Sequence, residues 1–583
     1  MSSLSALLKR ALHSLGLRKT LFISALLISG AVVAGVDRAE HGKDAEHEDR
    51  GGHELQILWT NDTHGFFMPV YHAEYSEIDS YADTAATEGK IGGYAQIAGL
   101  VNKLKDGEWK NRTLFVDAGD TFDGSPIAQL TRGAAVVPVL NAMGYDAWTP
   151  GNRDFAWSDG NFAAVASQLT IPTVCANLLD ASGNYVFPRY ITKQIGGMKI
   201  AMIGLTSLAG IASAGGAVEY TVLGGDIPGP ALELSISQLA ADIRATENPD
   251  LVIVLSHMGF YQDQKIAANT TGIDVIVGAH THHNVKKAPV VPNFDGSRNV
   301  IVVQAGSHGK YLGQLKLRTK HGKVVDYDNK LIRLSEKNLK KLHVKPDPVV
   351  EALAEQAYAP FKTMLDEVIG YTTTVLERRG DTQSTMTNFL TDAIAERYGV
   401  DGSRFPGIRY GSSNIPGPIT VGDVWNIVSP NHGNNQMYTY TLTGAAIRGS
   451  IFNGLNAEYG LDPYVWNGGD VLRYNNRVKY TYNADVNNPN HLVDLSITTT
   501  GGVTYDLVKN GVNVPANLAM VFTFAGTRPL PGAANAAPVP GVTAVDEIVA
   551  YIKSKPGATI SPVIDDRAVQ LDNAPTNIAD IDN

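Results

Sequence analysis

Carboxylate, imidazole and amide side chains recur in short polar turns along the first half of the chain. The turns are TNDTHG, DAGDTFDG, PGNRDF, LSHMG and GAHTHH, and they contain Asp62, His64, Asp120, Asn152, His257, His280 and His282. Loops at the carboxyl ends of strands meet at one crevice in open α/β sheets, so these turns could bring all seven side chains together. Donors of these types suit Zn²⁺, Mn²⁺ or Fe²⁺. The pattern therefore predicts a centre for two divalent metal ions.

A charge count indicates what such a centre would do. Two divalent ions contribute +4, while Asp62, Asp120 and a bridging hydroxide contribute −3, which leaves a net charge of +1. This charge attracts a phosphate ester. Two ions about 3.5–4 Å apart also lower the pKa of a bridging water, which then attacks phosphorus. The residues predict a metal-dependent hydrolase of phosphate esters with a metal-bridging hydroxide as nucleophile.

Apolar runs come directly before most of these turns and predict strands. The runs are LQILW, TLFVDA, KIAMIGL, DLVIVL, IDVIVG and NVIVVQA. Continuous runs of this length suit strands that are buried on both faces of a sheet. Helix-like stretches such as YAQIAGLVNKLKDG and LELSISQLAADIRATE separate several of the runs. Strands that alternate with helices indicate a layered α/β fold.

The chain is long enough for two large domains, because its 583 residues exceed the ~250–300 at which a single core stops growing. We expect the α/β domain over residues 54–340 and a connecting helix over 341–369. A mixed α+β domain is expected over 370–570, followed by an acidic tail over 571–583. The formal net charge of −10 leaves no basic footprint for a nucleic-acid polymer. The single cysteine, Cys175, excludes an intramolecular disulfide and is expected in the core.

The N-terminus indicates export. Basic residues precede an apolar run of 16 residues, LFISALLISGAVVAGV, which ends at Val36. That length exceeds a signal-peptide core only slightly and falls short of the ~20 residues of a spanning helix. Residues 1–36 are therefore expected to be a signal peptide or a retained membrane anchor, and residues 37–53 a charged spacer. The protein would then work in the periplasm or outside the cell.

The order of the motifs NDTHG, DAGD, GN, SHMG, GAHTH and QAG with KYLG resembles the bacterial periplasmic 5′-nucleotidase / UDP-sugar hydrolase family of calcineurin-like metallophosphoesterases. The resemblance implies a four-layered αββα catalytic domain, then a substrate-binding domain, and a small phosphorylated substrate, of nucleotide type. We expect the protein to be a monomer or a dimer. One metal would be held by Asp62, His64, Asp120 and His282. The other would be held by Asp120, Asn152, His257 and His280.

The third motif departs from the family. The family has Gly-Asn-His-Glu-Phe-Asp, whereas this chain has GNRDFA, so that Arg153 and Ala156 replace a His–Asp dyad. An arginine stays protonated and cannot replace histidine as a proton donor. Our hypothesis is that Arg153 is catalytic and binds phosphate oxygens in a bidentate manner. The alternative is an ion pair with a neighbour such as Asp154. His308, in QAGSHGKYLG, is expected to have only a core or supporting role beside the site.

The expected substrate-binding domain departs as well. Asn414, in YGSSNIPGPIT, stands near the position of a substrate-binding arginine of the family. Phe524, in VFTFAGTRP, corresponds to one of two phenylalanines that sandwich a nucleobase, and the other is lost. Two alternatives to a nucleotidase therefore stay open. One is a hydrolase of another anionic ester, such as a cyclic nucleotide, a sugar nucleotide or a sulfur–oxygen substrate. The other is a non-catalytic periplasmic binding protein.

Overall fold

The structure is a computed structural model of the chain. It describes residues 52–71, 87–157, 160–208, 219–225, 228–377, 382–405, 412–428, 436–460, 473–488, 490–527, 529–530 and 532–574. All of them belong to the second of two compact units, Met1–Gly51 and Gly52–Asn583. The expected export segment over 1–36, almost all of the spacer over 37–53 and most of the tail over 571–583 lie outside the described residues. In the part that is described, no helix is long and apolar enough to cross a membrane.

Two sheets form the centre of the N-terminal part. The first has the order β13 (Lys323–Arg333), β12 (Tyr311–Lys320), β1 (His53–Thr60), β2 (Thr113–Asp117), β3 (Ala147–Trp148). The second has the order β10 (Val290–Pro292), β11 (Asn299–Val303), β9 (Val275–Gly278), β8 (Leu251–Ser256), β6 (Met198–Leu205), β5 (Tyr190–Ile195). A small pair, β4 (Leu178–Leu179) with β7 (Thr221–Val222), is separate. The six apolar runs are the strands β1, β2, β6, β8, β9 and β11, as predicted.

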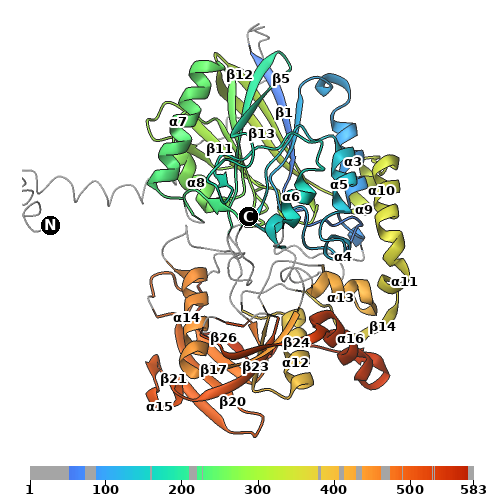
Figure 1. Ribbon diagram of the computed structural model, residues 1–583, viewed down its shortest axis with the longest axis vertical. Coiled ribbons are helices and arrows are strands. Elements are labelled where there is room, and N and C mark those ends of the chain that lie inside the picture. The colour runs from blue at the N-terminus through green and yellow to red at the C-terminus, as the bar shows by residue number, and fades with distance from the viewer. Residues whose placement is uncertain are drawn as a thin grey trace, which may run out of the picture. The chain divides into compact units, whose positions relative to one another are not determined.

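Helices cover the outer faces of these sheets. One side carries α3 (Tyr94–Leu104), α5 (Val136–Met143) and the short α4 (Pro126–Leu130) and α6 (Asn161–Ala166). The other carries α7 (Pro230–Thr246) and α8 (Phe260–Asn269), as Figure 1 shows. Separate apolar clusters lie under each helical layer and between the sheets. This arrangement confirms the α/β class and the four-layered αββα architecture.

Parallel pairing directs the strand ends to common edges. Strands β1, β2 and β3 pair in parallel in the first sheet, and β6, β8, β9 and β11 in the second. Strands β12, β13, β5 and β10 add antiparallel edges. The loops after β1, β2, β3, β8 and β9 therefore leave the carboxyl ends of parallel strands, where the predicted ligands stand.

The expected single helix over 341–369 is interrupted. After α9 (Glu336–Lys341), α10 (Pro348–Tyr358) begins with an Asp347 cap, and a 3-10 turn over Ala359–Phe361 separates it from α11 (Lys362–Leu365). Pro360 explains the break, because proline has no N–H for the helical ladder and its ring clashes with the preceding turn. A strand, β14, already begins at Val368.

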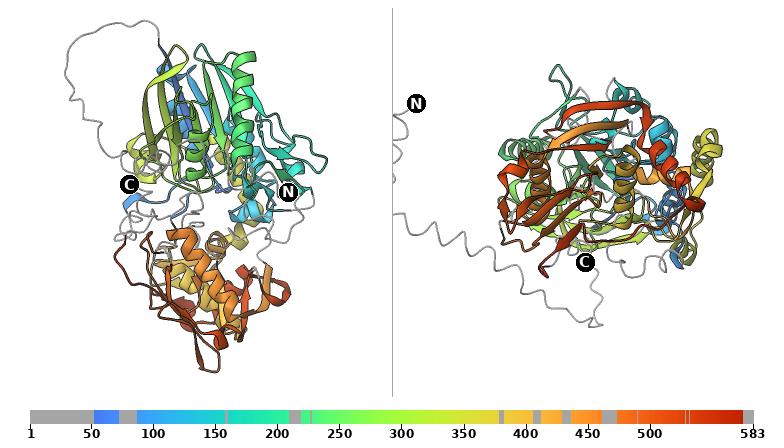
Figure 2. Two further views of the ribbon diagram at one scale, coloured as in Figure 1. Left: turned by 90° about the vertical axis from the view of Figure 1, so that its left-hand side faces the viewer. Right: turned by 90° about the horizontal axis from the view of Figure 1, so that it is seen from below.

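The C-terminal part is mixed α+β with two apolar clusters of its own. Its sheets have the strand orders β16-β14-β25, β18-β15-β23-β17-β24 and β22-β21-β20-β19-β26. Figure 2 shows this part of the chain, coloured from yellow through orange to red. The strands are β14 (Val368–Thr372), β15 (Gly402–Phe405), β16 (Gly417–Thr420), β17 (Gln436–Thr443), β18 (Arg473–Tyr474), β19 (Val478–Tyr482), β20 (Leu492–Thr498), β21 (Thr504–Lys509), β22 (Val512–Asn513), β23 (Val521–Gly526), β24 (Ala534–Thr543), β25 (Thr559–Ile560) and β26 (Ala568–Gln570). The helices are α12 (Thr385–Tyr398), α13 (Val421–Val428), α14 (Gly444–Tyr459), α15 (Pro515–Leu518) and α16 (Ala544–Ser554).

Cys175 lies in the core of the N-terminal part, as expected. Its side chain is fully buried, and its thiol lies 3.4 Å from Asn177 Oδ1. Burial raises the pKa of this thiol to about 12. The thiol is therefore protonated and inert in the folded protein.

Candidate metal centre

The structure brings the seven predicted ligand side chains together at the carboxyl ends of five strands. Asp62 and His64 follow β1, Asp120 follows β2, and Asn152 begins the 3-10 turn Asn152–Phe155 after β3. His257 follows β8, and His280 and His282 follow β9. Six of the seven are buried, and His280 is partly buried. The loops thus place charged and polar groups inside the protein, where a cation would balance them.

Four of these residues form a first group. His282 Nε2 lies 3.2 Å from Asp62 Oδ1 and 3.2 Å from His64 Nε2. His64 Nε2 lies 3.8 Å from Asp120 Oδ2. One ligand atom from each of Asp62, His64, Asp120 and His282 lies within 4.8 Å of all the others. Two carboxylates and two imidazoles in this arrangement fit one divalent cation.

A second group shares Asp120 with the first. His257 Nε2 lies 3.3 Å from Asp120 Oδ2 and 3.1 Å from Asn152 Oδ1. His280 Nδ1 also lies 3.1 Å from Asn152 Oδ1. Asp120 Oδ2 therefore stands between the two groups, as a carboxylate that bridges two metals would. The donors present fit two borderline divalent ions.

The backbone at the centre adopts a conformation that is uncommon outside glycine. Asp62, His64, Asp120, His280 and His282 have φ angles of 49°, 51°, 58°, 74° and 59°. Left-handed backbone at residues other than glycine costs of order 1–3 kcal/mol per residue and clusters at functional sites. Five such residues in three loops indicate that the surrounding fold holds the ligands in place before any ion binds.

Hydrogen bonds set the orientation of two ligand imidazoles. The Nδ1 of His64 donates to the Asp123 carbonyl oxygen at 2.8 Å, and the Nδ1 of His257 donates to the Ala118 carbonyl oxygen at 2.7 Å. In both rings this bond directs Nε2 toward the centre. A partner of this kind is the usual support for a metal-binding histidine.

Further contacts hold the carboxylates. Asn61 Nδ2 donates to Asp62 Oδ2 at 2.7 Å, and the His280 backbone N–H donates to the same oxygen at 3.0 Å. Asp154 braces the Asp120 loop, since its carboxylate accepts backbone N–H groups from residues 120, 121, 122 and 151. From the sequence, Asp154 was expected only as an ion-pair partner of Arg153. Its place two residues after Asn152, at the start of a short helical turn, was the available signal.

Burial and mutual charge shift the pKa values of the ligands. Burial lowers the pKa of His64 to about 4, so this imidazole is neutral and able to bind a cation. Burial raises the pKa of Asp62 to about 7. Burial alone would lower the pKa of His257, but Asp120 and Asp62 raise it to about 10. In the metal-free protein a proton on His257 therefore compensates the carboxylates, and a metal must displace it.

Arg153 is buried and pairs with a residue other than the one expected. Its Nε lies 3.3 Å from Asp123 Oδ2, and both side chains are almost fully buried. Gln129 Nε2 donates to the other carboxylate oxygen of Asp123. The Asp123 carbonyl is the acceptor for His64, so Arg153 is linked to a predicted metal ligand through one residue. The partner of the ion pair is thus Asp123, while Asp154 binds backbone N–H groups.

The two expected substrate residues of the C-terminal part have different surroundings. Asn414 is buried, its backbone pairs with that of Leu376, and its Oδ1 has no hydrogen-bond donor among the described residues. Phe524 lies within β23 and is fully buried. Its ring stacks on Tyr440 at 5.9 Å between centroids and packs against Gly402. The structure therefore does not support Phe524 as a stacking platform, because no ring face is accessible to a base.

Two family models match the chain. Residues 55–284 match the calcineurin-like phosphoesterase model, and residues 368–523 match the model of the 5′-nucleotidase C-terminal domain. The first range contains all seven predicted metal ligands, and the second contains Asn414.

Curated relatives are similar over much of this chain. The trifunctional nucleotide phosphoesterase YfkN of Bacillus subtilis is 28% identical over 66% of this chain and 27% of its own length. The 5′-nucleotidase of Diplobatis ommata is 27% identical over 59% of this chain and 59% of its own length. Protein UshA of Yersinia enterocolitica is 28% identical over 68% of this chain and 74% of its own length. The chain thus spans less than two thirds of the first two relatives.

Solved structures share the fold. The 5′-nucleotidase precursor of Thermus thermophilus superposes with a TM-score of 0.71 at 23% identity, over 90% of this chain and all of the other. The sulfate thiohydrolase SoxB of the same organism superposes with a TM-score of 0.74 at 19% identity, over 89% of this chain and 97% of the other. At these identities, the similarity is one of fold alone.

Proposed function

Because the chain combines a calcineurin-like phosphoesterase domain with a 5′-nucleotidase C-terminal domain, we propose that it is a metal-dependent hydrolase of phosphate esters of nucleotide type. The observation that carries the proposal is the position of Asp120 Oδ2, 3.8 Å from His64 Nε2 in one ligand group and 3.3 Å from His257 Nε2 in the other. A carboxylate shared in this way is what a two-metal phosphoesterase requires.

The residues of the centre have separate tasks in this reaction. Bound divalent ions supply the positive charge that holds the phosphate and lower the pKa of the attacking water. Asp62, His64 and His282 would hold one ion, and Asn152, His257 and His280 would hold the other. Asp120 would be a ligand of both. Since the Nδ1 atoms of His64 and His257 are occupied by carbonyl oxygens, these rings cannot turn away from the ions.

Arg153 is proposed as the residue that stabilises charge on the phosphate beside the centre. Its backbone N–H donates to Asp120 Oδ1 at 2.6 Å, which places the residue next to the bridging ligand. The ion pair with Asp123 orients the guanidinium. A fixed guanidinium can offer two parallel N–H donors to phosphate oxygens. Arginine cannot supply the leaving-group proton, so esters with good leaving groups are expected to react fastest.

The role of Arg153 is tested by comparing Arg153→Ala with Arg153→Lys. Loss of a donor to the transition state should lower kcat roughly 10²-fold in the alanine variant. Lysine restores the charge but not the paired donors, and should recover part of this loss. Metal content, measured in parallel, should be unchanged. An unchanged kcat for Arg153→Ala would remove the catalytic role.

The substrate is proposed to be a small nucleotide-type molecule that also contacts the 5′-nucleotidase C-terminal domain. The buried Asn414 Oδ1, which has no donor among the described residues, would accept a hydrogen bond from the substrate. The N-terminal basic and apolar segment supports export, so the reaction would take place in the periplasm or outside the cell. The overall charge of −10 argues against a nucleic-acid polymer as substrate.

The function is tested with purified full-length protein that is stripped of metal and reloaded with Mn²⁺ or Zn²⁺. The panel contains 5′-nucleotides, cyclic nucleotides, sugar nucleotides and thiosulfate-type esters. We expect release of phosphate from nucleotide-type substrates only after reloading. Turnover of the sulfur–oxygen esters alone would assign a different reaction to the same centre. Tight binding without any turnover would indicate a binding protein.

A further inference from the structure

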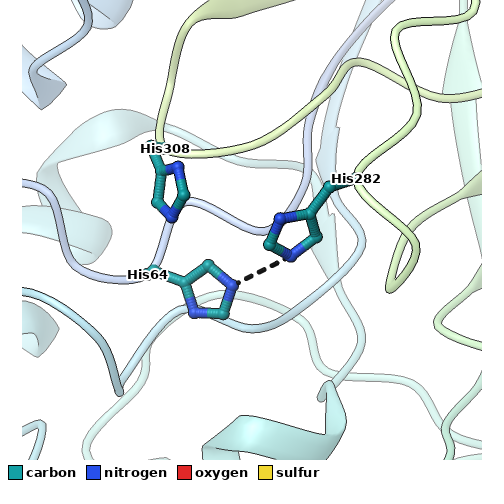
Figure 3. Close-up of side chains that lie close together, drawn as sticks. All are labelled: His64, His282 and His308. Carbon is teal, nitrogen blue, oxygen red and sulfur yellow. Dashed lines mark hydrogen bonds between the residues drawn. The ribbon is translucent and has the colours of Figure 1, made fainter. Parts of the chain in front are cut away.

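A third imidazole stands beside the first ligand group. His308 lies on the loop between β11 and β12, and its side chain is almost fully buried. One ligand nitrogen from each of His64, His282 and His308 lies within 4.8 Å of the other two. Figure 3 shows the three side chains lying close together. We propose that His308 is a further ligand of the metal ion held by Asp62, His64 and His282, an inference that rests on the proposed metal centre.

Several contacts hold His308 in this position. Its backbone N–H donates to the Asp62 carbonyl oxygen at 2.7 Å, which ties the loop to the first ligand turn. Its φ of 54° is left-handed, like those of the predicted ligands. Its ring lies edge-on to Phe66 at 4.6 Å, and Ser307 Oγ is 3.1 Å from its Nδ1. These contacts fix the ring at centroid distances of 5.4 Å from His64 and 5.7 Å from His282.

A third nitrogen donor would change which metal this position prefers. His64 and His282 belong to two overlapping groups, one completed by the carboxylates of Asp62 and Asp120 and the other by the imidazole of His308. Imidazole-rich sites favour Zn²⁺, Ni²⁺, Cu²⁺ and Fe²⁺, whereas oxygen-rich sites suit Mn²⁺ and Mg²⁺. His308 would therefore bias this position toward Zn²⁺ over Mn²⁺.

The test is metal binding by metal-free full-length protein, with two variants of His308. His308→Phe keeps an aromatic ring against Phe66 but has no donor, and His308→Asn keeps a residue that tolerates left-handed backbone. We expect either variant to bind Zn²⁺ about 10–100-fold more weakly at one position, or more weakly still. Removal of a residue that only supports a metal ligand already causes a loss of this size. Mn²⁺ binding should weaken less. The X-ray absorption of the zinc-loaded protein should show fewer imidazoles per ion.

Two control variants separate the possible failures. His283→Phe removes another buried imidazole, which packs on Phe260 and Tyr261 rather than in this group, and should leave Zn²⁺ binding unchanged. His64→Ala removes a ligand of the proposed centre and should lose one ion. If His64→Ala loses an ion while both His308 variants bind like the wild type with the same imidazole signal, only the role of His308 is overturned. If the wild type binds no metal, the proposed function is overturned, and the proposed role of His308 is overturned with it.

Discussion

The loops of the predicted metal ligands and the expected substrate residues of the C-terminal domain differ in how far the sequence determines where their side chains lie. All seven predicted ligands lie together, with distances of 3.1–3.8 Å between the neighbouring atoms described above. Of the two substrate residues, Asn414 presents a buried oxygen without a donor in the described part of the chain, and Phe524 belongs to the core. The difference lies in where each residue stands relative to its strand.

Residues directly after a parallel strand have a position that the sheet itself determines. Asp62, Asp120 and His257 follow strands whose hydrogen bonds fix where the chain emerges, so their convergence follows from topology. Phe524 stands inside β23, where side chains alternate between two faces of the sheet. Which face is accessible depends on what packs on the strand, and the sequence alone does not supply that.

The largest effect is expected from Asp120→Asn. The variant removes the negative charge shared by both ligand groups, so we expect activity to fall at least about 10³-fold and the protein to retain at most one metal. Phosphate release and metal analysis after gel filtration measure the two effects. Asp328→Asn, on the exposed strand β13, is the matched control and should change neither. Two metals retained by Asp120→Asn would contradict the bridging role.

A change in stability, not in substrate binding, is expected from Phe524→Ala. Loss of a fully buried ring should lower the free energy of unfolding by about 3–5 kcal/mol, while the KM of the folded fraction stays close to the wild-type value. Denaturant unfolding and steady-state kinetics separate the two effects. Phe294→Ala, at a ring that is 75% exposed, should leave stability nearly unchanged. A large rise in KM without loss of stability would restore Phe524 as a substrate contact.

The affinity of the centre for metal should depend on pH. Since the raised pKa of His257 is about 10, its ring is protonated at pH 7, and a metal can bind Nε2 only after this proton leaves. One released proton raises the apparent affinity for Mn²⁺ about tenfold per pH unit between pH 7 and 9. Calorimetric titrations in two buffers with different ionisation enthalpies count the protons. Affinity that is independent of pH over this range would contradict the assignment.

The same pKa shift has a consequence for stability. In the metal-free protein His257 has a folded-state pKa above its ordinary value of 6.5. Its stabilising contribution is therefore complete below pH 6.5 and is lost as the pH rises through about 10. Thermal unfolding of metal-free protein should show this loss, and protein loaded with metal should not, because its His257 is already deprotonated.

The smallest effect is expected from Asn414→Ala. If the substrate donates to Asn414 Oδ1, removal of one neutral hydrogen bond should raise KM about 2–10-fold at unchanged kcat. Ser413→Ala, at the preceding buried residue, serves as the neighbouring control. An unchanged KM for Asn414→Ala would leave the C-terminal domain without any of the substrate contacts that the sequence suggested.

Much of the fold could be predicted from the sequence, because six long apolar runs correspond to six buried strands. The supporting residues of the centre were harder to find. Asp154 acts through four backbone N–H groups, and such contacts leave no pattern in side-chain spacing. The pairing of Arg153 with Asp123 joins residues on two loops, whereas the sequence suggested the adjacent Asp154. His308 lies 26 positions after His282, and only the return of the chain through β11 brings the two rings together.

The lone thiol of Cys175 has a practical consequence. It is fully buried in an apolar cluster of the N-terminal part, and the chain has no other cysteine. A thiol-reactive dye can therefore label the natural protein only when this domain opens. At dye concentrations where labelling outpaces reclosing, the labelling rate gives the opening rate of this region without an engineered probe. Rates with and without bound Zn²⁺ then report how strongly the ions hold that region closed.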